Sequence, residues 1–198
     1  GQKMQNIVIG TNNKGKLKEY KFFLSDFFNV LTPADLGIDF NVAETGTTYE
    51  ENSLLKLEFL RNKNLNMAIL CDDSGLEIES LNNEPGVYSA RYAGEDSTDR
   101  ENINKVLLNL EGKSNRKAKF VCAISFYWED FSSFPKIFRG ECFGNILEKP
   151  LGEKGFGYDP IFYYEKLNKT FADLSEDEKN TISHRAIAMK ELLSKLNF

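Results

Sequence analysis

The fold prediction starts from one stretch, Met67-Ala68-Ile69-Leu70-Cys71-Asp72-Asp73-Ser74-Gly75-Leu76. Its first half is an apolar run of strand length, and two adjacent carboxylates follow where a buried strand is expected to end and open to solvent. In α/β proteins the chemistry lies at such strand ends. Neighbouring side chains on a strand point to opposite faces, so Asp72 and Asp73 are expected to do different jobs. Two acids this close repel each other, and a divalent metal is the simplest compensation.

Composition and length place the chain among ordinary globular proteins. Its 198 residues suffice for one domain, or for two small lobes around a shared sheet, with a substantial core. The formal net charge of −5 argues against nucleic acid and anionic membrane surfaces as partners. No apolar run approaches the length of a membrane span. We expect residues 1–3 to be a cloning remnant ahead of a natural start at Met4.

The cysteines indicate the compartment. Cys71, Cys122 and Cys142 are an odd set without metal-ligand spacing. We therefore expect reduced thiols and a cytoplasmic protein.

A polar loop joins the first expected strand, residues 6–10, to a helix expected over residues 17–24. Such a loop offers unpaired N–H groups and the positive end of a helix dipole, so we expect it to bind phosphate. The loop residues are Thr11, Asn12, Asn13, Lys14, Gly15 and Lys16. The stretch from Gly10 also fits most of a Walker A motif, but Leu17 stands where a Ser or Thr would bind Mg²⁺. The partial match leaves a P-loop phosphotransferase or ATPase as a competing interpretation, and Leu17 counts against it.

The next helix is expected to begin with a capping box of Thr48 and Glu51 and to run to about residue 62. Asn52 and Lys56 are four residues apart and share a face of it, although such pairs are usually solvated. We also expect a helix over residues 97–110, a hairpin of strands at 119–128 and 137–146, and a last helix from 184 toward 196.

Two later motifs indicate ligand binding, and the first of them suits a flat nucleobase. In Gly155-Phe156-Gly157-Tyr158-Asp159-Pro160 the glycines allow tight turns that leave aromatic faces and one acid at the loop surface. His184 and Arg185 follow the expected N-cap Ser183 of the last helix. Cations at a helix N-terminus work against the dipole, so their placement favours a ligand.

Taken together, the motifs resemble the inosine triphosphate pyrophosphatase family, the Ham1-like proteins. Its signatures match, in order, residues 44–56, 72–76 with 85–94, 155–160 and 178–185, over nearly the whole chain. The resemblance implies an α/β class: an elongated two-lobed fold around a long mixed β-sheet, with flanking helices and a central nucleotide cleft. It also implies a single domain over residues 1–198 and a homodimer.

The implied activity is Mg²⁺-dependent hydrolysis, with Mn²⁺ as a substitute, of non-standard purine nucleoside triphosphates. ITP, dITP and XTP would yield the monophosphate and pyrophosphate, which cleanses the nucleotide pool. The resemblance implies that Glu44 and Asp73 are metal ligands and that Lys16 and Lys56 are catalytic phosphate contacts. Asp73 is expected to be the base, with Asp72 as the open alternative. A regulator that senses a purine triphosphate without cleaving it is the alternative from another class.

The remaining expected substrate-binding residues are Thr11, Asn12, Asn13, Lys14, Gly15, Ser74, Phe156, Gly157, Tyr158, Asp159, Lys179, His184 and Arg185. Arg185 or His184 would donate to O6 of an oxo base, and Asp159 or a backbone carbonyl would accept from its N1–H. Phe156 and Tyr158 would pack against the ring.

Overall fold

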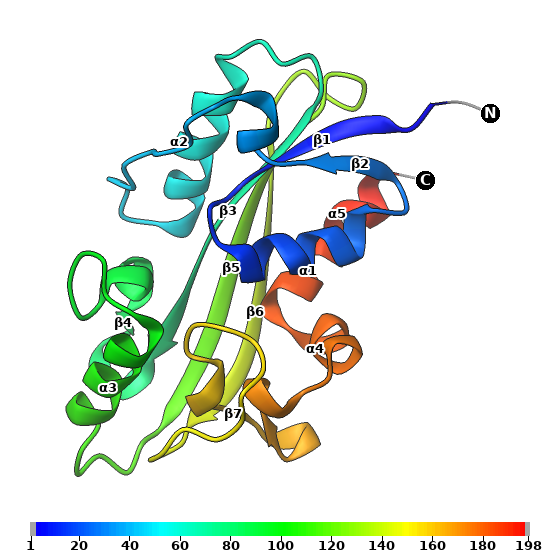
Figure 1. The fold of residues 1–198 in the computed structure, drawn as a ribbon. Coiled ribbons are helices and arrows are strands. Elements are labelled where there is room, and N and C mark those ends of the chain that lie inside the picture. Colours follow the sequence, from blue (N-terminus) through cyan, green and yellow to red (C-terminus); the bar gives the residue numbers. More distant parts are fainter. Residues whose placement is uncertain (1–2, 197–198) are drawn as a thin grey trace. The chain divides into compact units, whose positions relative to one another are not determined.

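The computed structural model describes residues 3–196, so the first two residues of the expected remnant lie outside the described part. Within residues 3–196 the strands form an eight-stranded mixed sheet in the order β2-β1-β3-β5-β6-β7-β8, with β4 paired to β3 (Figure 1). The strands are β1 Gln5–Gly10, β2 Phe28–Leu31, β3 Ala68–Ile78, β4 Glu84–Pro85, β5 Lys117–Tyr127, β6 Lys136–Ile146, β7 Phe162–Tyr164 and β8 Lys169–Thr170. The helices are α1 Lys14–Leu24, α2 Tyr49–Arg61, α3 Asp99–Asn109, α4 Glu176–Ile182 and α5 His184–Leu196. The predicted α/β class with a long mixed sheet and flanking helices is confirmed.

The described part of the chain divides into two compact units. Unit 1 comprises the residues up to Asp73, Cys122–Arg139 and the residues from Ala188 onward. Unit 2 comprises Ser74–Val121 and Gly140–Ile187. Each unit is thus assembled from separate stretches of the chain. None of the helices in residues 3–196 has the length and apolar character needed to cross a membrane.

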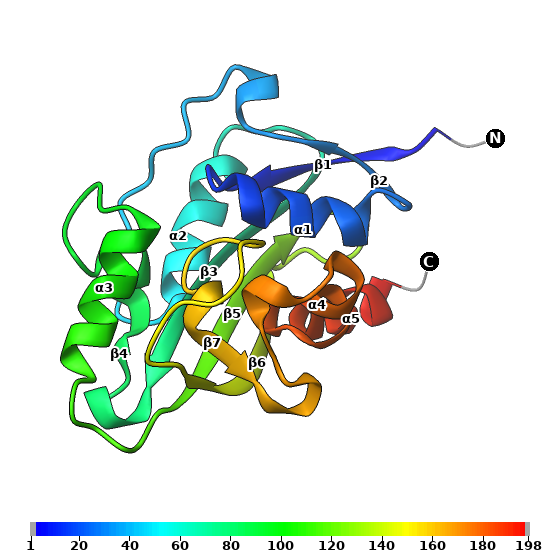
Figure 2. The same cartoon turned by 60° about the horizontal axis from the view of Figure 1, so that its bottom comes forward.

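Unit 1 is built on β1, which pairs in parallel with β2 on one side and β3 on the other. Helix α1 lies beside β2, and α2 contacts β1 (Figure 2). A side chain on Gly10, at the end of β1, would collide with the Cys71 sulfur and with Leu60, so glycine is required at this close approach. The one tryptophan of the sequence, Trp128, also lies in unit 1, with its ring edge against Phe28 at a centroid distance of 5.2 Å.

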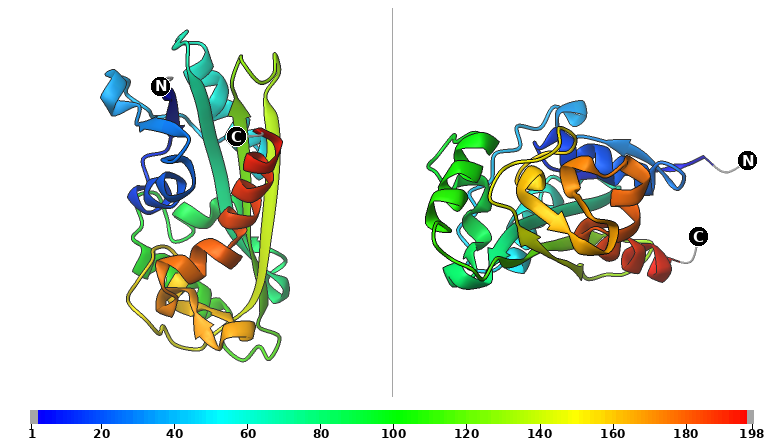
Figure 3. Two further views of the ribbon diagram at one scale, coloured as in Figure 1. Left: turned by 90° about the vertical axis from the view of Figure 1, so that its right-hand side faces the viewer. Right: turned by 90° about the horizontal axis from the view of Figure 1, so that it is seen from below.

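Unit 2 has an aromatic core. The rings of Phe120 and Phe162 lie 4.2 Å apart, and those of Phe162 and Phe171 lie 4.9 Å apart. The short strands β7 and β8 and the turn at residues 171–173 pack together in both views of Figure 3. Helix α3 begins with a complete capping box between Thr98 and Glu101.

Strand β3 differs from its prediction. It does not end at the aspartates: Cys71 pairs with Gly10 of β1, and the strand continues through them until Ile78 pairs with Glu84 of β4. Both carboxylates are buried in the middle of a strand, whereas an open strand end was predicted there. Beyond Cys71 the strand still has sheet partners, because β5 is its neighbour in the sheet and β4 pairs with Glu77 and Ile78 at its far end.

The helix predictions are confirmed with changes at their starts. Helix α1 begins at Lys14, earlier than expected, because the Asn13 side chain caps it by accepting from the Lys16 N–H. In α2 only half of the expected capping box forms, since the Glu51 carboxylate accepts from Thr47 N rather than from the cap residue itself. The predicted hairpin is confirmed, because β5 and β6 are sheet neighbours and residues 128–135 are too short for a parallel crossover.

Candidate functional site

The candidate site in unit 1 is centred on Asp73, which β3 holds at 4% exposure. The Asn52 amide of α2 donates to Asp73 Oδ2 at 3.0 Å. Burial and the charge of Glu44 raise the pKa of Asp73 to about 6. Lys16, Lys56 and Asn52 act in the opposite direction. These opposing effects leave the pKa of this carboxyl close to neutral pH, where a general base is most useful.

The Asn52 side chain is itself held in place while it contacts the Asp73 carboxylate. Its amide oxygen accepts from Gly46 N at 2.8 Å while its nitrogen donates to Asp73. One turn later on the same helix, Lys56 Nζ lies 3.2 Å from Glu44 Oε1. Burial alone would lower the pKa of Lys56, but the surrounding carboxylates raise it above its usual value. The ammonium group is therefore charged and paired with Glu44.

Asp72 points to the other face of the strand, toward α1. Its Oδ1 lies 3.3 Å from Lys16 Nζ, and the carboxylate is 1% exposed. The two side chains point to opposite faces of the strand as predicted, because Asp73 contacts α2 and Asp72 contacts α1; that they do different jobs stays a prediction.

The polar loop before α1 is tied down by its own side chains. Thr11 Oγ1 accepts from Asn13 N at 3.1 Å, and Asn12 Nδ2 donates to the Phe40 carbonyl at 2.6 Å. Lys14 and Gly15 belong to the first turn of the helix rather than to the loop, and the Lys14 side chain is exposed. Lys16 also lies in α1, and of these two lysines the structure brings Lys16 to the acidic group.

The donor set of unit 1 fits Mg²⁺ in one specific way. The described residues contain no cluster of three or more His, Cys, Asp or Glu side chains that could hold a metal by themselves. Mg²⁺ is commonly held by one or two carboxylates together with substrate phosphates and water. Asp73 and Glu44, which are close enough for one to raise the pKa of the other, supply such a pair.

The candidate base-binding loop lies in unit 2. Asp159, which is 4% exposed, accepts from Phe156 N at 3.1 Å and from Lys179 Nζ at 2.7 Å. Lys179 Nζ also lies 4.6 Å from the centroid of the Phe156 ring. Tyr158 is buried, and its hydroxyl donates to the Ser89 carbonyl at 2.6 Å. Asp159 and Tyr158 thus hold the loop in shape and leave Phe156 half-buried at its surface.

The two cations of the last helix have different surroundings. Arg185 donates from Nη2 to Ser74 Oγ at 3.2 Å, and its guanidinium carbon lies 5.9 Å from the Phe156 ring centroid. His184 stacks on Phe120 at a centroid distance of 4.7 Å. Arg185, Ser74 and Phe156 therefore form one group, while His184 lies against the aromatic core.

Two residues beside the candidate sites were not found from the sequence. Asp99 Oδ2 accepts from Gly157 N at 2.9 Å and holds the base loop from the start of α3. Tyr20 donates to Asp72. Both are far from their partners in sequence, so no local motif indicates them. Helix α4, which carries Lys179, was also missed, although Ser175 followed by Glu178 is a capping-box signal.

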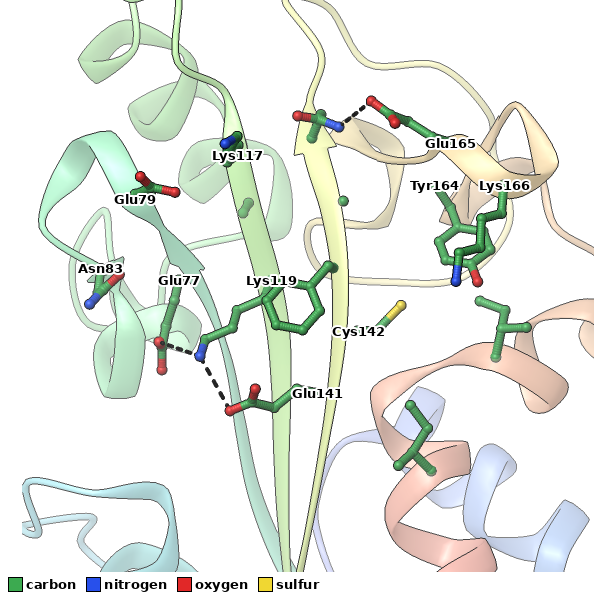
Figure 4. Close-up of a pocket in the computed structure, with 16 residues that line it drawn as sticks. Glu77, Glu79, Asn83, Lys117, Lys119, Glu141, Cys142, Tyr164, Glu165 and Lys166 are labelled. Carbon is green, nitrogen blue, oxygen red and sulfur yellow. Dashed lines mark hydrogen bonds and ion pairs between the residues drawn. The ribbon is translucent and has the colours of Figure 1, made fainter.

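A separate hollow of about 750 Å³ lies in unit 2 (Figure 4). None of the expected site residues lines it. Lys119, at its centre, lies 3.8 Å from Glu77 and 3.3 Å from Glu141. These ion pairs offset the lysine charge, so the hollow offers an anion little attraction.

The family model, the curated relatives and the solved structures that match this chain agree with one another. The model of the Ham1 family matches residues 7–195. A Staphylococcus aureus protein named dITP/XTP pyrophosphatase is 48% identical over 189 residues, which are 96% of this chain and 95% of the relative. The solved structure of the Staphylococcus aureus Ham1 protein has a TM-score of 0.84 at 47% identity, covering 97% of this chain and 98% of that one. A Ham1 protein from Coxiella burnetii has a TM-score of 0.86 at 40% identity, covering 98% of both chains. The chain therefore belongs to the Ham1 family.

Proposed function

We propose that the chain hydrolyses non-standard purine nucleoside triphosphates, namely ITP, dITP and XTP, to the monophosphate and pyrophosphate. The observation that carries the proposal is the buried group around Asp73, in which the Asn52 amide holds the carboxylate at 3.0 Å and Lys16, Lys56 and Glu44 lie within its electrostatic reach. A protein that only binds nucleotides gains little from a base prepared in this way. The name of the 48% identical relative supports the substrate class.

In the proposed reaction the lysines bind the phosphates and Asp73 activates water. Lys16 and Lys56 neutralise phosphate charge, because phosphoryl-type transfer depends chiefly on positioning and electrostatic stabilisation. Asp73, oriented by Asn52, accepts a proton from water as the water oxygen attacks the α-phosphorus atom. The bond between the α-phosphoryl group and the β-phosphate breaks, and pyrophosphate leaves.

Glu44 and Asp73 are the residues proposed to hold Mg²⁺, or Mn²⁺ in its place. When bound, the cation supplies Lewis-acid stabilisation of phosphate charge. Its positive charge would also offset the repulsion between these two carboxylates.

The base is proposed to bind at Phe156 in unit 2. An oxo purine presents an acceptor at C6 and a donor at N1, whereas adenine presents the reverse pattern. Arg185 is the proposed donor to O6, because it already lies 5.9 Å from the ring of Phe156. Asp159 is engaged by Lys179 and Phe156 N, so we favour a backbone carbonyl as the acceptor from N1–H and assign Asp159 to holding the loop.

The first test is pyrophosphate release from ITP, GTP and ATP with Mg²⁺. Wild type should act strongly on ITP and weakly on the other two, and Asp73→Asn should lose the activity. Tyr163→Phe is the matched control, because it removes an exposed hydroxyl contact to Asn168 outside both candidate sites. Orthophosphate release from ATP would favour the P-loop interpretation, and binding without turnover would favour the sensor.

Two further properties are proposed alongside the activity: a homodimer and a cytoplasmic location. All three cysteines are buried thiols, which suits a reducing compartment. Analytical ultracentrifugation at micromolar concentration would test the dimer directly.

A further inference from the structure

A tyrosine that no site motif includes contacts the acidic group of unit 1. Tyr20 lies on α1, four residues after Lys16, so the two side chains share a face of the helix. The Tyr20 hydroxyl donates to Asp72 Oδ2 at 2.5 Å, and Lys16 Nζ lies 3.3 Å from Oδ1 of the same carboxylate. Tyr20 is fully buried. One carboxylate thus bridges a tyrosine and a lysine from the same helix.

This arrangement fixes the carboxylate plane. A carboxylate that accepts a strong donor at each oxygen cannot rotate without breaking a bond to one of them. The Cys122 sulfur lies 3.9 Å from the oxygen that Tyr20 contacts, but a thiol is a weak donor and cannot replace the hydroxyl. The Tyr20 bond is therefore the contact that aims Oδ1 of Asp72 at Lys16.

Lys16 needs such an anchor. Lysine carries a point charge on a flexible stem and, unlike arginine, has no planar fork to fix its direction. Its position is then set by the groups it contacts, and here Asp72 is one of them. A shift of about 1 Å in a group that binds the reacting phosphates can cost on the order of a hundredfold in rate.

We propose that Tyr20 is a positioning residue for phosphate binding: through Asp72 it holds the Lys16 ammonium group where the triphosphate binds. The inference rests on the proposed function. It also assigns Asp72 to holding Lys16, because both of its oxygens already accept hydrogen bonds, and leaves Asp73 as the base.

The test is Tyr20→Phe, which keeps the ring and removes only the hydroxyl. Calorimetry would measure binding of an inosine triphosphate analogue with nitrogen between the α and β phosphorus atoms, which does not require turnover. We expect the dissociation constant to rise roughly tenfold or more, the range for losing a charge-assisted contact between Lys16 and a phosphate, and kcat/KM for ITP to fall at least as much. The control Tyr163→Phe should change neither value.

A double-mutant cycle separates positioning from support of the fold. In a Lys16→Met background, Tyr20→Phe should cause little further loss of binding, because the group it positions is gone. If Tyr20→Phe raised the dissociation constant by the same factor in both backgrounds, the proposal would be overturned. Wild-type binding and wild-type kcat/KM in the single variant Tyr20→Phe would also overturn it.

If Tyr20→Phe does not fold, Asp72→Asn takes its place in the same cycle. It keeps an acceptor for the tyrosine and weakens the hold on Lys16, so the same loss and the same non-additivity are expected. Failure of the proposed function has a different outcome: wild type would release no pyrophosphate, whereas the binding cycle would still report on Tyr20.

Discussion

Replacing Asp73 by asparagine should stabilise the metal-free protein while it removes the proposed base. Burial and Glu44 raise the pKa of this carboxyl from 3.8 to about 6. The folded state prefers the protonated carboxyl. Its contribution to stability is therefore fully present below the pKa of the unfolded chain and is lost as the pH rises toward the pKa of the folded protein. Above that range the ionised carboxylate costs the fold about 3 kcal/mol, from roughly two pKa units at 1.36 kcal/mol each. The neutral amide avoids that cost, and its oxygen can still accept from Asn52.

The measurement is urea unfolding followed by far-ultraviolet circular dichroism, with EDTA present to remove metal ions. At about pH 7.5 the variant should exceed wild type in unfolding free energy by about 3 kcal/mol, and at about pH 5 by about half as much. Asp72→Asn is the matched control one residue away. It removes the charge from a half-buried ion pair with Lys16 and should lower the unfolding free energy by about 1–2 kcal/mol. A variant at position 73 that is no more stable than wild type, or a gain that does not shrink on acidification, would refute the reasoning.

Other contacts predict the results of further substitutions. Lys179→Met leaves the buried Asp159 carboxylate without its 2.7 Å partner and should cost about 3 kcal/mol in urea unfolding, with Asp159→Asn in the same chain restoring part of it. Gly10→Ala places a methyl group against the Cys71 sulfur and should lower the unfolding free energy by about 1–3 kcal/mol; no change would mean that β1 can shift away from β3. Thr98→Ala removes the cap of α3 and should cost about 1 kcal/mol in thermal unfolding.

Much of the fold is readable from local signals. The starts of α2 and α3 follow from Thr48 and Thr98, because capping is decided within one helical turn. The α/β class follows from apolar runs alternating with helical periodicity. The continuation of β3 through the aspartates does not follow, because it depends on pairing with strands that are distant in sequence or short: β5 is its neighbour in the sheet, and Glu84 and Pro85 of β4 carry no strand signal of their own.

The candidate site divides in the same way. The motifs indicate Glu44, Asp73 and Lys56, and the structure brings these residues into electrostatic reach of one another. The motifs do not indicate which side chains hold them. Tyr20 meets Asp72 across 52 positions of the chain, and Asp99 meets Gly157 across 58. Such partners follow from packing, which sequence spacing does not encode.

The placement of Trp128 against Phe28 gives the protein a natural spectroscopic probe of one unit. Because the sequence holds one tryptophan, emission excited at the red edge of indole absorption reports on unit 1, while circular dichroism averages over every helix and strand. Coincident melting curves from the two signals would indicate a single cooperative transition. If the emission changed first or last, the two units would unfold separately, and the stability of each could be assigned without introducing a label.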